Sequence, residues 1–172
     1  MIKPEDAIRT ARSLIGMPYK EMDCIALIRA VIKRSPGGVA DYRCEGTNWL
    51  WRSIGNSSKY RHLIWQQEGI EGARVGMLAF KRNGEDVHHV GLVSGDGTVI
   101  HSSSVIGCVV ETELDGSWDC LGQHRYIEVD AEQMQQPEAD ASDTNAGNKK
   151  TTLIRSDGVE ICIDGDWRVA QD

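Results

Sequence analysis

The feature that most restricts the fold is a short turn in the middle of the chain. Residues 95–97 read Gly-Asp-Gly and separate two β-prone runs, residues 89–94 and 98–102. A glycine-rich turn of this length joins antiparallel neighbours, so the two runs are predicted to form a β-hairpin. One strand of this hairpin carries His89 and the other carries His101.

Pairing across the turn, centred near Asp96, predicts the register of the hairpin. Gly91 falls opposite His101, and His89 falls opposite a residue near position 103. Alternate side chains of a strand share one face of a sheet, whereas neighbouring side chains point to opposite faces. His89 and His101 are therefore predicted to face the same spot, and His88 is predicted to face away from it.

A cysteine stands at the start of a predicted helix. Asp23-Cys24 opens an apolar run that reaches Ile32, and residues 23–33 are predicted to form a buried helix. A thiol attacks only as thiolate, and a helix N-terminus with a nearby imidazolium can lower its pKa to roughly 3.5–7.5. A cysteine followed by two strand histidines is typical of a cysteine hydrolase, in which one histidine pairs with the sulfur and a second group orients it.

The remaining pattern predicts an α+β fold. Apolar residues recur at helical spacing in residues 4–15, and helical turns are predicted at 48–51 and 60–67. From Gly76 onward, short β-prone runs alternate with turn residues. The predicted strands are 77–81, 89–94, 98–102, 105–111 and 124–129.

Composition and charge exclude several partners and locations. A net charge of -7 argues against nucleic acid as the main partner, because phosphate binding needs clustered Lys and Arg. No apolar run approaches the roughly 20 residues that span a membrane, so no transmembrane segment is predicted. Residues 1–6 lack the apolar core of a secretory signal, so any target outside the cytoplasm is expected to be reached by another route.

The other cysteines give no sign of a cofactor. Cys44, Cys108, Cys120 and Cys162 form no C-x-x-C pair, so neither a zinc finger nor a thioredoxin-like motif is indicated. We interpret these four residues as small buried or half-exposed thiols, and we predict neither a metal nor a cofactor.

The C-terminal part of the chain differs in composition from the rest. Residues 1–132 are predicted to form the catalytic domain, and residues 133–150, with almost no apolar side chains, a flexible linker. Residues 151–172 contain three β-prone runs and two Asp-Gly turns, which predicts a short β-hairpin or meander. Because so few residues cannot form a core of their own, this tail is expected to dock on the catalytic domain or on another copy, giving a homo-oligomer.

An ordered set of motifs resembles the NlpC/p60 cysteine peptidases, which cut bacterial cell-wall peptides. The set runs from residue 4 to about 129 in the family's order. The resemblance implies a papain-like fold with N-terminal helices packed on an antiparallel sheet. The matching motifs are Gly-Met-Pro-Tyr at 16–19, Met-Asp-Cys-Ile-Ala-Leu-Ile at 22–28, Gly-Met-Leu at 76–78, His-Val-Gly-Leu-Val at 89–93, Gly-Asp-Gly at 95–97 and Ile-His-Ser at 100–102.

Carried over by position, the resemblance implies a role for each site residue. Cys24 would be the nucleophile, His89 the general base and His101 the residue that orients His89. Tyr19 and Asp23 would line the substrate pocket. The sequence departs from the family after Asp-Cys, where Ser-Gly is usual and Ile25-Ala26 stand here. Because Ile25 offers no oxygen, recognition of a free ammonium group at the stem N-terminus is not expected.

The resemblance implies hydrolysis of peptidoglycan stem peptides, typically between D-glutamate and a diamino acid. A domain with a linker, a β-like tail and no signal peptide also resembles bacteriophage lytic or tail-associated proteins, which reach the wall by lysis or virion delivery. Three alternatives remain: another cysteine amidase or acyltransferase on this scaffold, a non-catalytic structural or wall-binding module, and a metalloprotein using His88, His89 and His101.

Overall fold

The computed structural model describes residues 1–53, 62–95 and 97–129 in full, and the backbone of 151–155, 158–163 and 166–169. The chain divides into two compact units, Met1–Met134 and Gln135–Asp172. The linker predicted at 133–150 lies outside the described residues.

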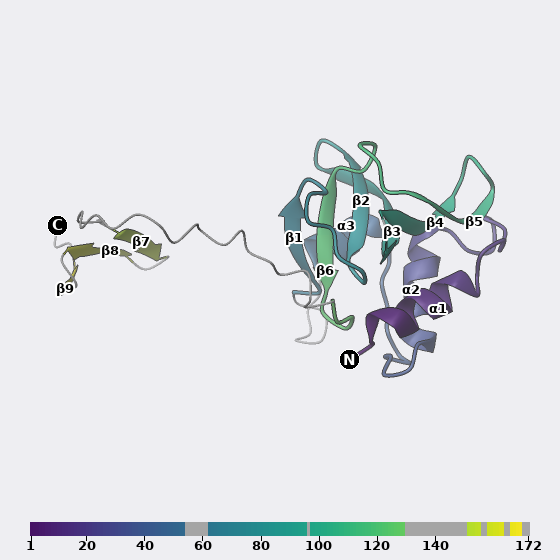
Figure 1. The fold of residues 1–172 in the computed structure, drawn as a ribbon, viewed down its shortest axis with the longest axis horizontal. Helices are drawn as coiled ribbons and strands as arrows, with labels where there is room; N and C mark the ends of the chain where they lie inside the picture. The colour runs from purple at the N-terminus through teal and green to yellow at the C-terminus, as the bar shows by residue number, and fades with distance from the viewer. Residues whose placement is uncertain (54–61, 96, 130–150, 156–157, 164–165, 170–172) are drawn as a thin grey trace, which may run out of the picture. The chain divides into compact units, whose positions relative to one another are not determined.

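The first unit is built on a six-stranded sheet with strand order β1-β6-β2-β3-β4-β5. All neighbouring strands in it pair antiparallel, as the sequence predicts (Figure 1). β3 and β4, which flank the Gly-Asp-Gly sequence, are the fourth and fifth strands in this order. The strands are β1 Ile64–Glu68, β2 Leu78–Asn83, β3 Asp86–Gly95, β4 Thr98–Ser103, β5 Cys108–Glu113 and β6 Cys120–His124.

Two predicted elements are wrong. Helical turns were predicted at 60–67, but residues from Ile64 onward form β1, which pairs with β6. Within β1, Ile64 is buried and Trp65 is 56% exposed. The last strand was predicted at 124–129, but β6 ends at His124. The chain then turns, because the N–H of Ile127 bonds the carbonyl of His124 over 3.0 Å.

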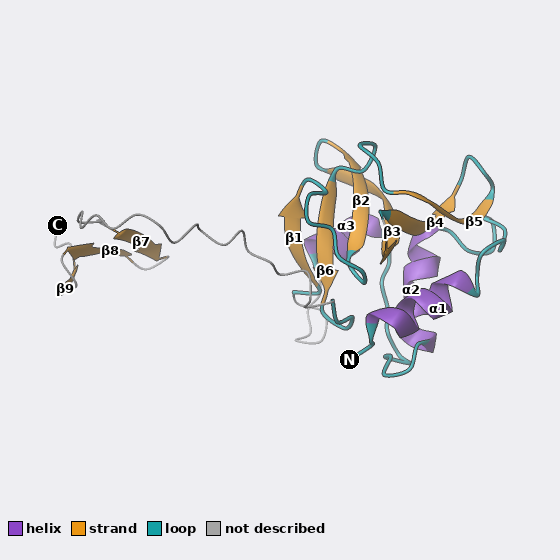
Figure 2. Ribbon diagram, in the orientation of Figure 1, coloured by secondary structure: helices purple, strands orange, loops and turns teal. Residues whose placement is uncertain are grey.

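Three helices pack against this sheet (Figure 2). The first, α1 (Pro4–Arg12), ends three residues before the predicted limit, and Ile15 is 45% exposed. The second, α2 (Cys24–Arg34), agrees with the predicted helix to within one residue at each end. The third, α3 (Thr47–Arg52), includes the helical turn predicted at 48–51. Helix α2 packs against β3 and β4, and α3 packs against β1 and β3.

The sheet buries side chains on both faces. Towards the helices, Leu78, Phe80, Val90 and Leu92 join the apolar faces of α1 and α2 in the main core. On the other face a smaller cluster forms around Ala79, Val93, Val99, Leu121 and Trp118. A strand buried on both faces places neighbouring side chains in different environments, so β3 separates its two histidines.

A polar network fixes α1 to the hairpin strands. Arg12 donates two hydrogen bonds to the Glu111 carboxylate, of 3.0 and 2.8 Å. Ser94 and Thr98 donate to Oε1 of the same carboxylate over 2.8 and 3.0 Å. The Arg12 guanidinium, followed by these hydroxyls, lowers the pKa of Glu111 to about 2.

The second unit contains an antiparallel sheet of three strands in the order β7-β8-β9. The strands are β7 Thr151–Arg155, β8 Gly158–Ile163 and β9 Asp166–Val169. They form the meander that the two Asp-Gly turns predict. Among the described residues, no helix has the length and apolar character needed to cross a membrane.

Candidate active site

The candidate nucleophile lies at the N-terminus of α2. Asp23 caps this helix, since its Oδ1 accepts the N–H of Ala26 over 2.7 Å. Cys24 is the first helical residue and is 7% exposed. The backbone of Val90 in β3, the residue next to His89, lies close enough to the thiol to lower its pKa. The sulfur therefore lies between the helix start and the strand that carries His89.

The pKa of this thiol differs from the sequence-based expectation. Burial raises the pKa of Cys24, and the negative charge of Asp23 adds to this increase. Hydrogen bonds from the backbone of Val90, Ile25 and Cys24 itself oppose it. Burial outweighs the helix N-terminus, so the resting cysteine is a neutral thiol rather than a thiolate.

The segment before the nucleophile is attached to the β4–β5 hairpin. The N–H of Tyr19 donates to the carbonyl of Gly107 over 2.8 Å, and the hydroxyl of Ser102 donates to the carbonyl of Met22 over 2.5 Å. Tyr19 is half-buried. Its pKa is raised, first by burial and then by the neighbouring Cys24 and Asp23. The structure thus brings together three of the predicted site residues.

The two predicted histidines are in direct contact. Nε2 of His89 and Nδ1 of His101 are 2.9 Å apart and share a hydrogen bond. Gly91 pairs with His101 across β3 and β4, as predicted. His89 is half-buried and His101 is 8% exposed, whereas His88 is exposed. The prediction that His89 and His101 share a face and that His88 does not is confirmed.

Gly91 leaves the space in which this pair forms. A Cβ atom at position 91 would lie 3.0 Å from Cβ of His101 and 2.6 Å from Cγ2 of Val99. Either distance is too short for ordinary packing, so a side chain here would displace the strand that carries His101. Glycine is therefore required at position 91, because β4 approaches the backbone of β3 too closely there for a side chain.

Two further residues contact the histidine pair. Nε2 of His101 and Oγ1 of Thr112 on β5 are 3.1 Å apart. The ring of Trp118, between β5 and β6, lies 5.4 Å from the ring of His89 and 5.3 Å from that of His101. Sequence reasoning missed both residues. Thr112 could have been found from the register, because it lies two residues beyond Val110, the partner of His101; nothing local indicated Trp118.

Both imidazoles are neutral at neutral pH. Burial lowers the pKa of His89 to about 4, helped by the positive charges of His101, Lys81 and His88. Burial and Lys81 also lower the pKa of His101. At neutral pH the Cys24 thiol and the His89 imidazole are therefore both uncharged.

Several solved structures share this arrangement of helices and strands. The NlpC/p60 domain of the peptidoglycan hydrolase SagA matches with a TM-score of 0.50 and 20% identity, over 69% of this chain and 96% of that one. The peptidoglycan hydrolase RipB of Mycobacterium tuberculosis matches with a TM-score of 0.51 and 21% identity, over 73% and 65%. The P60 domain of an antigen from M. avium subspecies paratuberculosis matches with a TM-score of 0.52 and 17% identity, over 72% and 94%.

This chain has the NlpC/p60 fold. The sequence itself matches no protein-family model and no curated protein. The ordered motifs thus predicted a fold that overall sequence similarity does not reveal.

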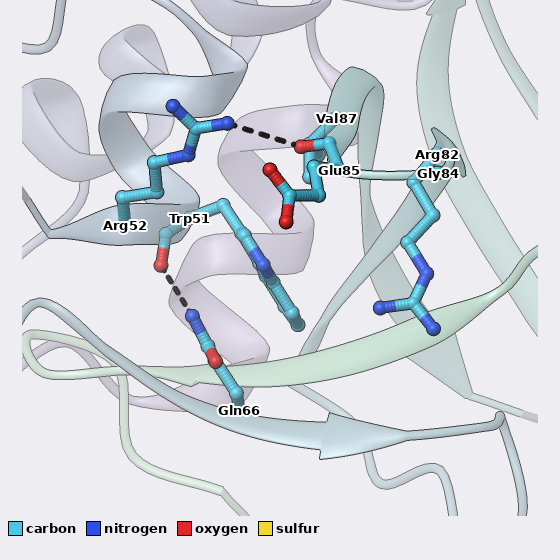
Figure 3. A pocket seen from close by; sticks show the side chains of 7 residues that line it. All are labelled: Trp51, Arg52, Gln66, Arg82, Gly84, Glu85 and Val87. Atoms are coloured by element: carbon cyan, nitrogen blue, oxygen red, sulfur yellow. Dashed lines mark hydrogen bonds between the residues drawn. The ribbon is translucent and has the colours of Figure 1, made fainter.

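A hollow in the NlpC/p60 unit lies apart from these residues. It opens between α3, β1 and the β2–β3 hairpin, with Trp51, Arg52 and Arg82 among its lining side chains (Figure 3). Arg52 donates to the carbonyl of Glu85 over 3.2 Å, and Arg82 forms a two-pronged ion pair with Glu68. None of the candidate catalytic residues lines this hollow.

The other cysteines of the NlpC/p60 unit remain thiols. Cys44, Cys108 and Cys120 are free, as is Cys24. Burial raises the pKa of Cys44 and of Cys120 to about 11. The side chain of Cys162, on β8, is outside the described part of the chain. Within the fully described ranges, no three His, Cys, Asp or Glu side chains gather as metal ligands would.

Proposed function

We propose that this protein is a cysteine peptidase that hydrolyses peptidoglycan stem peptides, with Cys24 as nucleophile, His89 as general base and His101 as the residue that orients His89. The observation that carries the proposal is the 2.9 Å hydrogen bond between His89 on β3 and His101 on β4. His89 is followed on β3 by Val90, whose backbone lies by the Cys24 thiol. The NlpC/p60 fold, found also in two peptidoglycan hydrolases, supports the substrate class.

The proposed role uses one of the two tautomer arrangements that these hydrogen bonds allow. When Nε2–H of His89 donates to Nδ1 of His101, Nε2–H of His101 is left to donate to Thr112 Oγ1. This arrangement leaves Nδ1 of His89 unprotonated and able to accept the thiol proton. The opposite arrangement would protonate Nδ1 of His89 and remove its basicity. The proposed role of His89 therefore requires the first arrangement, in which the Thr112 hydroxyl accepts from Nε2–H of His101; in the second arrangement the same hydroxyl would donate to Nε2.

The reaction follows from these positions. His89 takes the thiol proton as the Cys24 sulfur attacks the peptide carbonyl carbon, and the backbone N–H of Cys24 at the α2 N-terminus donates to the oxyanion. The carbon–nitrogen bond then breaks, and His89 returns its proton to the leaving amine. Water, deprotonated by His89, attacks the thioester, and the Cys24 sulfur leaves and regains a proton.

A neutral resting pair gives this mechanism a distinct pH dependence. Only neutral His89 accepts a proton, so kcat/KM should rise with pH through about 4, the pKa of His89, instead of near 6.5. Because burial raises the thiol pKa, iodoacetamide should label Cys24 slowly at neutral pH in the absence of substrate. In an enzyme with a preformed thiolate–imidazolium pair, iodoacetamide would instead label the cysteine rapidly at neutral pH.

Within this substrate class, we propose cleavage between D-glutamate and the diamino acid. Tyr19 and Asp23 adjoin Cys24, and in this proposal they line the peptide's path. Ile25, where the family usually has serine, is 6% exposed and offers no oxygen to an ammonium group. Stems that are still attached to sugar should therefore be cleaved as readily as stems with a free L-alanine.

The test is digestion of defined muropeptides with product masses read by mass spectrometry. The wild-type protein should release a new diamino acid N-terminus from both intact and amidase-treated muropeptides, and Cys24→Ala should release none. Products cut at the sugar–peptide amide would instead indicate an amidase, and acyl products an acyltransferase. Release of no product by a correctly folded protein would leave the non-catalytic wall-binding module as the better reading.

A further inference from the structure

Three aromatic rings pack together at the candidate site. The ring centroids of His89 and His101 are 5.0 Å apart, and Trp118 lies 5.4 and 5.3 Å from them. The plane of the Trp118 ring is tilted by 31° to His89 and stands at 87° to His101. The indole thus lies roughly over the face of one imidazole and meets the other edge to face, both of which are favourable aromatic arrangements.

Trp118 is held in this position from β2. Lys81 donates to the hydroxyl of Ser117 over 2.7 Å, and its ammonium lies 4.7 Å from the centre of the Trp118 ring. The N–H of Asp119 donates to the carbonyl of Phe80 over 2.9 Å. The residues on both sides of Trp118 are therefore tied to one strand. The indole itself is 4% exposed.

The position of the indole bears on the hydrogen bond between the histidines. His89 is only half-buried, so the Nε2–Nδ1 bond lies near solvent. A ring that covers the face of His89 restricts rotation of the imidazole and keeps water from competing for Nε2. Without it, the imidazole could rotate and present the wrong nitrogen to the thiol.

We propose that Trp118 is a positioning residue, which acts through the His89–His101 hydrogen bond by fixing the orientation of both rings and excluding water from them. The expected change in kcat rests on the proposed function. The effect of Trp118 on the orientation of the two imidazole rings does not, because it applies to the protein without substrate. Trp118 contacts neither the thiol nor substrate in this role, and its contribution is the geometry of the base.

The charges around His89 define what removal of the indole should do. His101 faces His89 from β4, Lys81 from β2, His88 lies beside it on β3, and the Cys24 thiol lies by Val90 from α2. Shortening Trp118 replaces none of these groups, although Lys81 loses its contact with the indole. Water that enters the vacated space favours the imidazolium, so the pKa of His89 should rise from about 4 towards its ordinary value of 6.5.

Trp118→Ala and Trp118→Phe test the kinetic consequence. Trp51→Phe is the matched control, because Trp51 is also buried, with 8% of its surface exposed. Its ring centroid lies 4.9 Å from that of Phe80, on the helix side of the sheet and away from the two histidines. With a stem-peptide substrate, Trp118→Ala should lower kcat by about tenfold with little change in KM. Its acid limb of kcat/KM should shift to higher pH, and Trp118→Phe should recover part of both effects.

An NMR titration of the imidazole signals keeps this test independent of activity. In the wild type, the signals of His89 should titrate well below pH 6.5; in Trp118→Phe they should titrate at higher pH, and in Trp51→Phe they should not move. If His89 titrates identically in wild type and Trp118→Phe, the proposal is wrong. If the histidine signals shift as expected but no variant hydrolyses stem peptides, the proposed function fails while the positioning role stands.

Discussion

Two histidine environments on the same sheet both lower the pKa of an imidazole through burial, but they differ in their hydrogen-bond partners. His124, at the end of β6, is fully buried; Tyr126 N–H donates to its Nδ1 and the Tyr42 hydroxyl meets its Nε2, each over 3.1 Å. His89 and His101 instead bond to each other. Burial lowers the pKa of His124 to about 3 and that of His89 to about 4.

The difference shows which observations mark a candidate catalytic histidine. Nδ1 of His124 accepts a backbone N–H, so Nε2 carries the proton and donates it to Tyr42, and both nitrogens are in use. His89 uses one nitrogen for His101 and sits beside Val90, whose backbone lies by the Cys24 thiol. A lowered pKa alone therefore does not separate the two environments; the partners of the two ring nitrogens do.

The largest expected difference between the two environments is the loss of activity when His89 is replaced. His89→Ala should lower kcat/KM for a stem peptide by about a thousandfold or more, because no group remains to take the thiol proton. Its free energy of unfolding should change little, since His89 is half-buried. Steady-state kinetics and urea unfolding measure the two quantities on the same sample.

His88→Ala is the control for His89→Ala, because His88 is exposed on the same strand and points away from the pair. It should leave kcat/KM nearly unchanged. His101→Asn should fall between the two, since an amide replaces part of the orienting hydrogen bond. A larger loss of activity in His88→Ala than in His89→Ala would contradict the assignment of faces along β3.

His124→Ala should show the opposite division between activity and stability. It removes the hydrogen bonds that His124 makes with the Tyr42 hydroxyl and the Tyr126 N–H and opens a cavity in the core, which together should cost about 3–5 kcal/mol of unfolding free energy. The molecules that remain folded should keep wild-type kcat. A large fall in kcat at unchanged stability would break the distinction between the two environments.

The hairpin and the histidine pair could be predicted because their signals are local. A Gly-Asp-Gly turn fixes the register of β3 and β4, and the alternation of side chains then places His89 with His101. The apolar run after Cys24 likewise fixes α2. These elements depend on neighbours within a few residues along the chain.

The missed features depend on contacts between distant parts of the chain. Trp118 reaches His89 from 29 positions away, and Lys81 holds it from a third strand. β1 was mistaken for helical turns because its five residues show no alternation of buried and exposed side chains and its partner β6 comes much later in the chain. The raised pKa of Cys24 follows from burial beneath β3, which the helix start alone does not indicate.

A smaller effect should appear in the stability of the protein in acid. The folded-state pKa of His124 is about 3 and its unfolded-state value is about 6.5, so the unfolded chain binds the proton more readily. The contribution of neutral His124 is therefore complete above about pH 6.5 and is lost as pH falls, with about 2 kcal/mol lost by pH 5.

Urea unfolding at pH 7 and pH 5 tests this, with His124→Gln as the comparison. Glutamine keeps a donor for Tyr42 and cannot be protonated. Wild type should lose about 2 kcal/mol more than His124→Gln between the two pH values. The lowered pKa values of His89 and His101 act in the same direction in both proteins and cancel in the difference. Equal losses of unfolding free energy in the two proteins would mean that protonation of His124 does not destabilise the fold.

The smallest effect on the chemistry should come from deleting residues 135–172. Every contact named for the two histidine environments comes from the first compact unit, Met1–Met134. The truncated protein should therefore hydrolyse a small soluble stem peptide at the wild-type rate. The meander β7–β9 contains isoleucines on short strands, and exposed strand edges favour association. Light scattering should accordingly detect a change in oligomeric state, or a sedimentation assay a change in wall binding. A folded truncation with no activity on the soluble peptide would show that the tail completes the active site.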